Sequence, residues 1–100
     1  MEVLFYSENE MMCQAFALAF KQYEMKVIDF GDFNEIDYQL EEFPAVAIIV
    51  DLDSVEVPQD VALKLSHCNK TIMTVGSNTN FQWEHFKLPV NPSKLAQILA

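Results

Sequence analysis

Short apolar runs and amphipathic segments alternate along the 100-residue chain, and this alternation limits the folds that it can adopt. Five runs have the length and the β-branched or aromatic content of strands. Four other segments repeat apolar residues every three or four positions, as helices do. The predicted strands cover residues 3–6, 26–30, 46–50, 71–75 and 85–88. Strands that alternate with helices favour a parallel sheet covered on both faces.

Capping signals mark where the predicted helices begin. The expected starts are Ser7 with Glu10, Asp32 with Glu35, Pro58, and Asn91 followed by Pro92. The residues expected to face the core are Met12, Phe16, Ala19 and Tyr23 in the first helix, Ile36, Leu40 and Phe43 in the second, and Val61, Leu63 and Leu65 in the third.

The segment between the fourth and fifth strands is short and rich in Asn, Ser and Thr. Because 13 positions separate Val75 from Leu88, we expect the helix that would join these strands to be absent or reduced to one turn. Right-handed crossovers then favour a doubly wound, five-stranded parallel sheet with strand order 2-1-3-4-5. Residues 1–100 are predicted to form one domain.

The charge of the chain is strongly negative and unevenly distributed. The net charge is −9, all six basic residues are Lys, and ten of the fifteen acids lie in residues 29–60. Such a surface repels a phosphate backbone, so we expect no nucleic-acid binding by this domain. No apolar run approaches the roughly 20 residues of a membrane helix. Cys13 and Cys68 lie far apart and are expected to be reduced thiols, as in a cytoplasmic protein.

Polar and acidic residues follow the predicted strands at the places where ligands gather in parallel sheets. If the strand order is 2-1-3-4-5, four segments meet at one edge. These segments are Ser7-Glu8, Asp51 to Asp53, Val75-Gly76-Ser77 and Leu88-Pro89. We therefore expect one candidate site at this edge, centred on Asp51.

Three interpretations of Asp51 are open. In the first, Asp51 is a phosphoacceptor; this chemistry would need Mg²⁺, and Glu8 and Asp51 would be the carboxylate ligands of the metal ion. Alternatively, the sequence "DLDSV" resembles the first motif of haloacid-dehalogenase-like phosphatases, with Asp51 as nucleophile and Asp53 as acid/base. The third interpretation is structural: Asp51 binds the backbone of the loop that follows the strand.

The whole chain resembles a response-regulator receiver domain (CheY-like), which has the flavodoxin-like strand order. In that family an acid pair ends the first strand, a phosphoacceptor Asp ends the third, a Ser or Thr ends the fourth, and Lys-Pro follows the fifth. The corresponding positions here are Ser7 and Glu8, Asp51, Val75, and Leu88-Pro89. The resemblance implies a cytoplasmic, bacterial module of two-component or phosphorelay signalling.

The departures from the family pattern indicate a site that has lost its phosphoryl chemistry. Ser7 replaces one metal-binding acid, and Glu8 is longer than Asp. Val75 has no hydroxyl, although a slip of one or two residues would offer Thr74 or Ser77. Leu88 has no ammonium group, and Lys87 is expected to point to the opposite face of its strand.

The chain is therefore predicted to be a pseudo-receiver that acts through protein contacts or dimerisation, not as an enzyme, and without a cofactor. The alternative is a receiver that is phosphorylated on Asp51 with Mg²⁺. Phe81, Trp83 and Phe86 either fill the gap left by the missing helix or form an interface. Atypical receivers of this kind are found at the N-termini of transcriptional regulators and of pilus-assembly or polar-localisation ATPases similar to the TadZ/CpaE group. The chain is therefore expected to be the N-terminal regulatory module of a larger bacterial protein, and a stand-alone adaptor is the alternative.

Overall fold

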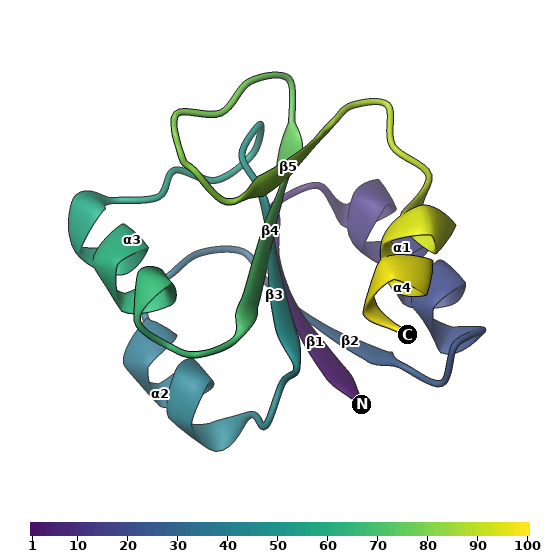
Figure 1. Cartoon of the computed structure of the whole chain (residues 1–100), viewed down its shortest axis with the longest axis horizontal. Helices are drawn as coiled ribbons and strands as arrows, with labels where there is room; N and C mark the ends of the chain where they lie inside the picture. The colour runs from purple at the N-terminus through teal and green to yellow at the C-terminus, as the bar shows by residue number, and fades with distance from the viewer.

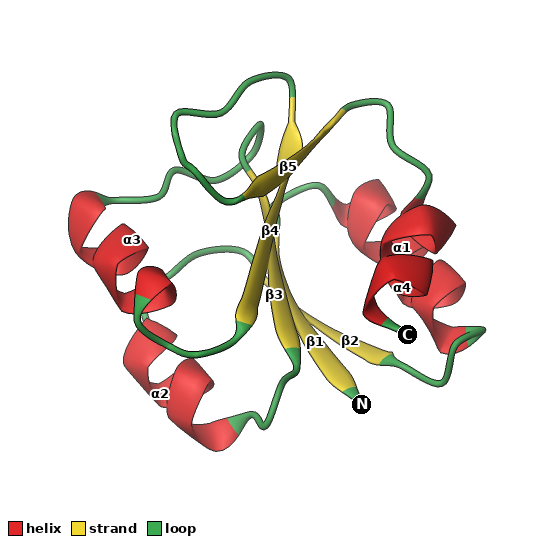
Figure 2. Cartoon of the chain, in the orientation of Figure 1, coloured by secondary structure: helices red, strands yellow, loops and turns green.

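The computed structural model describes all 100 residues and has three layers, with one parallel sheet between two pairs of helices (Figures 1 and 2). The strands are β1 (Glu2–Tyr6), β2 (Lys26–Phe30), β3 (Ala47–Asp51), β4 (Thr71–Gly76) and β5 (Glu84–Lys87). The helices are α1 (Glu10–Lys21), α2 (Ile36–Glu42), α3 (Gln59–Ser66) and α4 (Pro92–Leu99). All strands are parallel in the order β2-β1-β3-β4-β5, which confirms the predicted fold.

The two faces of the sheet have separate hydrophobic cores, because successive side chains of a strand point to opposite faces. From β1, Val3 and Phe5 pack beneath α1 and α4, whereas Leu4 and Tyr6 pack beneath α2 and α3. Phe5 stacks on Phe16 of α1 with a centroid distance of 4.5 Å. None of the four helices combines the length and the apolar character needed to cross a membrane.

Both predicted capping boxes, Ser7 with Glu10 and Asp32 with Glu35, are wrong. Asn9, not Ser7, caps α1, since its side chain accepts a hydrogen bond of 3.1 Å from the Met12 N–H. Ser7 still continues β1, and its own N–H donates to the Phe30 carbonyl at 2.9 Å. At α2 no side chain caps the helix, and Asp32 instead accepts from the N–H of Asn34 within the preceding loop. Asn91 does cap α4, with Pro92 in the first turn, as predicted.

The buried faces of two helices also differ from the prediction. In α1 the buried residues are Cys13, Phe16 and Phe20, while Met12 and Ala19, and Tyr23 just after the helix, are only partly buried against that core. In α3, Leu63 is wrongly predicted to face inward: its exposed fraction is 56%. Residues two apart on a helix point in nearly opposite directions, so α3 buries Val61 and Leu65 and excludes Leu63.

The connection from β4 to β5 contains no helix, as predicted, and residues 77–83 are irregular. The pairing register explains how so short a connection suffices. Glu84, the first residue of β5, lies beside Met73, so β5 pairs only with the last four residues of β4. The connection therefore has to return along only about three residues of β4, or roughly 10 Å. A connection that returns along a whole strand usually needs a dozen residues or more.

A polar pair lies within the core between the sheet and α2. The Tyr6 hydroxyl donates a hydrogen bond of 2.6 Å to the side-chain oxygen of Gln39, and both residues are buried. The Tyr6 ring also stacks on Phe33 with a centroid distance of 4.4 Å. Burial raises the pKa of the Tyr6 hydroxyl well above its usual value, with a smaller effect from Cys68. The hydrogen bond between Tyr6 and Gln39 therefore ties β1 to α2 within this core.

Candidate functional site

Ser7, Asp51 and Val75 lie side by side at the carboxyl edge of the sheet. Val75 is the register partner of Asp51, and the pairing of Tyr6 with Val50 brings Ser7 next to Asp51. By alternation along each strand, all three side chains point to the face covered by α1 and α4. The structure thus brings together the segments that sequence reasoning placed at one edge.

The Asp51 carboxylate is buried and bound by groups of the chain itself. Its exposed fraction is 1%. One carboxylate oxygen accepts hydrogen bonds from the hydroxyls of Ser7 and Ser54, each 2.8 Å long. The other accepts from the backbone N–H of Asp53 at 3.1 Å. Three donors therefore satisfy a carboxylate that would otherwise be costly to bury.

Ser54 is the residue of this site that sequence reasoning missed. Its hydroxyl donates to Asp51 and accepts from the Glu8 N–H at 2.9 Å, so it ties the end of β1 to the loop after β3. The Ser7 hydroxyl likewise accepts from the N–H of Asn9 at 3.0 Å. The spacing of three residues from Asp51 allows a local side-chain hydrogen bond, but the spacing alone does not distinguish Ser54 from the other residues of the loop.

The arrangement around Asp51 does not fit a magnesium ion. Mg²⁺ prefers an octahedron of oxygen ligands that includes one or two carboxylates, waters and phosphate oxygens. Here both carboxylate oxygens of Asp51 already accept hydrogen bonds from O–H and N–H groups of the protein. Glu8, the other predicted ligand, is exposed, and no group of three or more His, Cys, Asp or Glu side chains gathers in the structure as a metal site.

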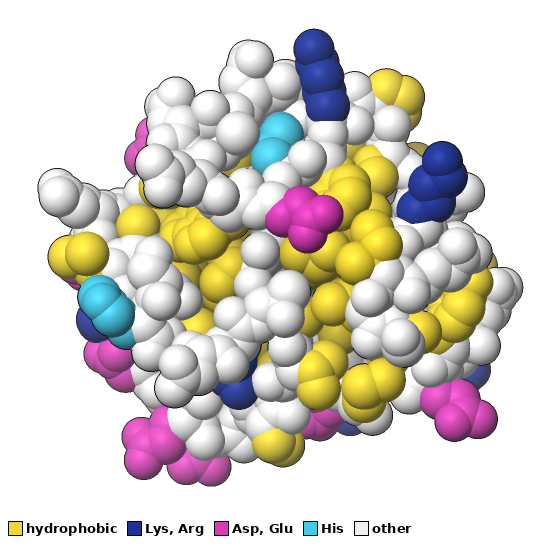
Figure 3. All heavy atoms as spheres, in the orientation of Figure 1, with side chains coloured by type: hydrophobic (Ala, Val, Ile, Leu, Met, Phe, Trp, Pro, Cys, Tyr) yellow, Lys and Arg dark blue, Asp and Glu magenta, His cyan; other side chains and the backbone are white.

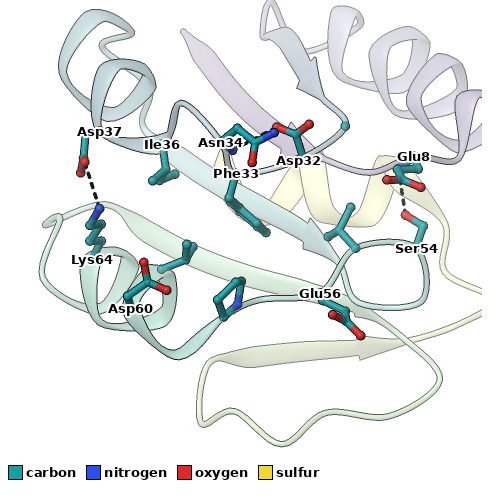
Figure 4. Close-up of a pocket in the computed structure, with 14 residues that line it drawn as sticks. Glu8, Asp32, Phe33, Asn34, Ile36, Asp37, Ser54, Glu56, Asp60 and Lys64 are labelled. Carbon is teal, nitrogen blue, oxygen red and sulfur yellow. Dashed lines mark hydrogen bonds and ion pairs between the residues drawn. The ribbon is translucent and has the colours of Figure 1, made fainter.

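Glu8 instead lies at the margin of a cavity of about 620 Å³ between the loops that precede α2 and α3 (Figure 4). Five carboxylates line this cavity, and its one lysine, Lys64, pairs with Asp37 at 2.9 Å. Buried apolar side chains such as Phe33 and Val61 form its inner wall. The carboxylates are those of Glu8, Asp32, Asp37, Glu56 and Asp60. This side of the molecule is therefore strongly acidic.

Asp53 faces away from Asp51 and binds the next loop. Its two carboxylate oxygens accept from the backbone N–H and the hydroxyl of Ser77, each at 2.9 Å. The Ser77 N–H lowers the pKa of Asp53 most, followed by the Ser77 hydroxyl, and His85 adds a smaller effect. Gly76 makes room for this contact: its φ is +149°, and a Cβ atom there would lie 3.1 Å from an Asp53 oxygen.

The remaining predicted site residues lie at the ends of β4 and β5. Val75 is fully buried, and Leu88 packs against the same core. Leu88 is joined to Pro89 by a cis peptide bond, and Lys87 is exposed. Thr74 points to the opposite face from Val75. Its hydroxyl lies 2.7 Å from Nδ1 of His85, whose Nε2 lies 3.1 Å from the Gly76 carbonyl oxygen.

The three aromatic residues predicted as gap fillers or interface are all partly buried. Phe81 stacks on Trp83 with a centroid distance of 4.8 Å. Trp83 packs against the core beneath α2 and α3, whereas Phe86 packs against the core beneath α1 and α4. Aromatic side chains therefore cover part of both faces of the sheet beside β5.

Comparison with solved structures identifies the fold as that of response-regulator receiver domains. A two-component response regulator from Clostridium difficile has a TM-score of 0.79 and 11% identity, covering 99% of this chain and 92% of that one. The chemotaxis protein CheY4 of Vibrio cholerae has a TM-score of 0.73 and 16% identity, with coverage of 98% and 94%. The pseudo-receiver domain of CikA has a TM-score of 0.71 and 17% identity, with coverage of 98% and 92%. No protein-family model and no curated protein matches the sequence.

Proposed function

We propose that this chain is a pseudo-receiver: a signalling module with the receiver fold that works through contacts with a protein partner or a second copy of itself. The observation that carries the proposal is the state of Asp51. Its side chain is buried, and the hydroxyls of Ser7 and Ser54 occupy the oxygen that a phosphoryl donor or a metal ion would approach. The similarity to the CikA pseudo-receiver domain supports the proposal at the level of fold.

The substitutions around Asp51 point the same way. Phosphoryl transfer relies on positioned positive charge, from metal ions or lysine, to stabilise the transferring group. Leu88 is apolar and packed into the core, and Lys87 belongs to the outer strand with its side chain exposed. We propose that the module also has no phosphatase activity, because both Asp53 oxygens are engaged by Ser77 and do not face Asp51.

A phosphorylation experiment tests the proposal directly. The protein is incubated with Mg²⁺ and acetyl phosphate, or with beryllofluoride, and followed by intact mass and by amide NMR shifts. We expect no adduct and no shift around Asp51. A stoichiometric adduct that is lost in Asp51→Asn would overturn the proposal in favour of a phosphorylated receiver. Turnover of a generic phosphomonoester, abolished in the same variant, would instead establish a phosphatase.

A further inference from the structure

The strand β5 is an outer strand of the sheet, and part of its backbone has no partner. In a parallel ladder, alternate residues bond to the neighbouring strand. The Leu88 N–H donates to the Gly76 carbonyl at 3.1 Å, so Glu84, Phe86 and Leu88 are the residues of this stretch that bond toward β4. The N–H and C=O groups of His85 and Lys87 therefore point away from β4, and no hydrogen bond of a turn, a loop or a side chain uses them.

The surroundings of this edge are apolar on both faces. In the orientation of Figure 1, Figure 3 shows hydrophobic side chains to either side of the place where β5 lies, with an acidic side chain and a histidine between them. Phe81 and Trp83 lie on one side, and Phe86 and Leu88 lie on the other, all partly buried. The helix that follows β5, α4, packs beside α1 and does not run along the outer edge of β5 (Figure 1). An open edge flanked by apolar side chains is a template for an added strand.

We propose that β5 is a dimerisation edge, at which a second copy of this chain pairs antiparallel to form a continuous ten-stranded sheet. In one register, the outward backbone groups of one copy can all pair with the same groups of the second copy. When His85 lies opposite Lys87 of the second copy, and Lys87 opposite His85, all of their outward N–H and C=O groups form four hydrogen bonds. The two-fold axis then passes between the Phe86 residues of the two copies, whose rings meet in the closely spaced, non-hydrogen-bonded pair.

Charge favours this edge over the acidic cavity side for contact between two copies. Residues 61–100 contain one acid, Glu84, and four lysines, whereas fourteen of the fifteen acids precede residue 61. A net charge of −9 per chain opposes the association of two copies in general, and it opposes contact through the acidic cavity side more strongly than contact at β5. A two-fold contact also matches the usual symmetry of soluble dimers. The inference rests on the proposed function, since a module that acts by contact needs such a surface.

Sedimentation of the full chain across protein concentration tests the inference, with two variants at one position. Lys87→Pro removes an outward N–H from each copy and spares the ladder to β4, a position at which proline is tolerated in outer strands. Lys87→Ala keeps that N–H and removes only the charged side chain. We expect a dimer for the wild type and for Lys87→Ala, and at least a tenfold weaker dimer for Lys87→Pro, which loses two hydrogen bonds per dimer.

Amide NMR of the wild type supplies a second readout that does not depend on how a variant folds. Dilution across the dimer transition is expected to shift the His85 and Lys87 amides strongly and the Asp51 region little. A wild type that stays monomeric at about millimolar concentration overturns the inference, as does a dimer whose shifts centre on another surface. If a monomer pairs at β5 only with an added extended peptide, the occupant is a partner's strand and the second-copy inference is wrong. None of these results requires a phosphodonor, so they leave the test of Asp51 phosphorylation independent.

Discussion

Removal of the Ser7 hydroxyl measures how firmly the chain itself holds the Asp51 carboxylate. Ser7 has an exposed fraction of 4%, donates to Asp51 at 2.8 Å and accepts from the Asn9 N–H at 3.0 Å. In Ser7→Ala the buried carboxylate loses one of its three donors. A hydrogen bond to a charged group contributes about 1.5–3 kcal/mol, so we expect Ser7→Ala to lower the free energy of unfolding by about 2 kcal/mol. Ser54 is only partly buried, so water replaces its hydroxyl more easily and Ser54→Ala is expected to cost about 1 kcal/mol.

Urea denaturation at micromolar protein, followed by the fluorescence of Trp83, is the suitable assay. For a chain of this size the slope is about 1 kcal/mol per molar urea, so the Ser7→Ala midpoint should fall by about 2 M. Ser93→Ala is the matched control, because only the backbone N–H of Ser93 makes a hydrogen bond at its helix start. Its stability should stay within about 0.5 kcal/mol of the wild type. If the stability of Ser7→Ala also stays within that range, the conclusion that the Ser7 hydroxyl stabilises the buried Asp51 carboxylate is wrong.

Three further perturbations test other contacts of the site and core. The pKa of Asp53 is lowered in the folded state, so the ionised carboxylate stabilises the fold at a pH above its unfolded-state pKa of about 4, and this effect is lost as the pH falls through the folded-state pKa. The loss of stability caused by Asp53→Asn, measured in urea, should therefore be smaller at pH 3 than at pH 6. A loss that does not change with pH would contradict the contact with Ser77. Tyr6→Phe leaves the buried Gln39 oxygen without its donor, and calorimetry should show a loss of about 1–3 kcal/mol. Gly76→Ala forces a side chain onto a φ of +149° and should lose about 1–3 kcal/mol in urea, whereas Gly31→Ala, whose nearest contact is 3.9 Å away, should lose less than 1 kcal/mol.

The arrangement of the sheet and of the Asp51 edge follows from patterns that are local in the sequence. Apolar runs with helical segments between them specify parallel strands, and the right-handed crossover then determines the strand order. Once the order is known, the residues that end each strand must meet. For this reason Ser7, Asp51 and Val75 were correctly placed together, and the missing helix before β5 followed from the length of its segment.

The contacts that decide the state of Asp51 could not be obtained in the same way. Ser54 reaches Asp51 only because the loop after β3 folds back on itself, and a strand pattern carries no information about that loop. Ser7 has the sequence spacing of a helix cap, but the hydrogen bond of its N–H to Phe30 keeps it in line with β1. Leu63 was misplaced although the start of α3 at Pro58 was predicted, because Val61, Leu63 and Leu65 are spaced two apart and cannot all share one face of a helix.

The short pairing of β5 gives the molecule two regions of unequal local stability. β5 is bonded to the sheet along four residues of β4 and is joined to it by the irregular residues 77–83. Segments with few cooperative contacts open at a lower free energy than the core strands do. We therefore expect β5 and this connection to open together while β1 and β3, which position Ser7 and Asp51, remain folded. Limited proteolysis of the monomer is expected to cut first within residues 77–83 and to spare the Asp51 edge.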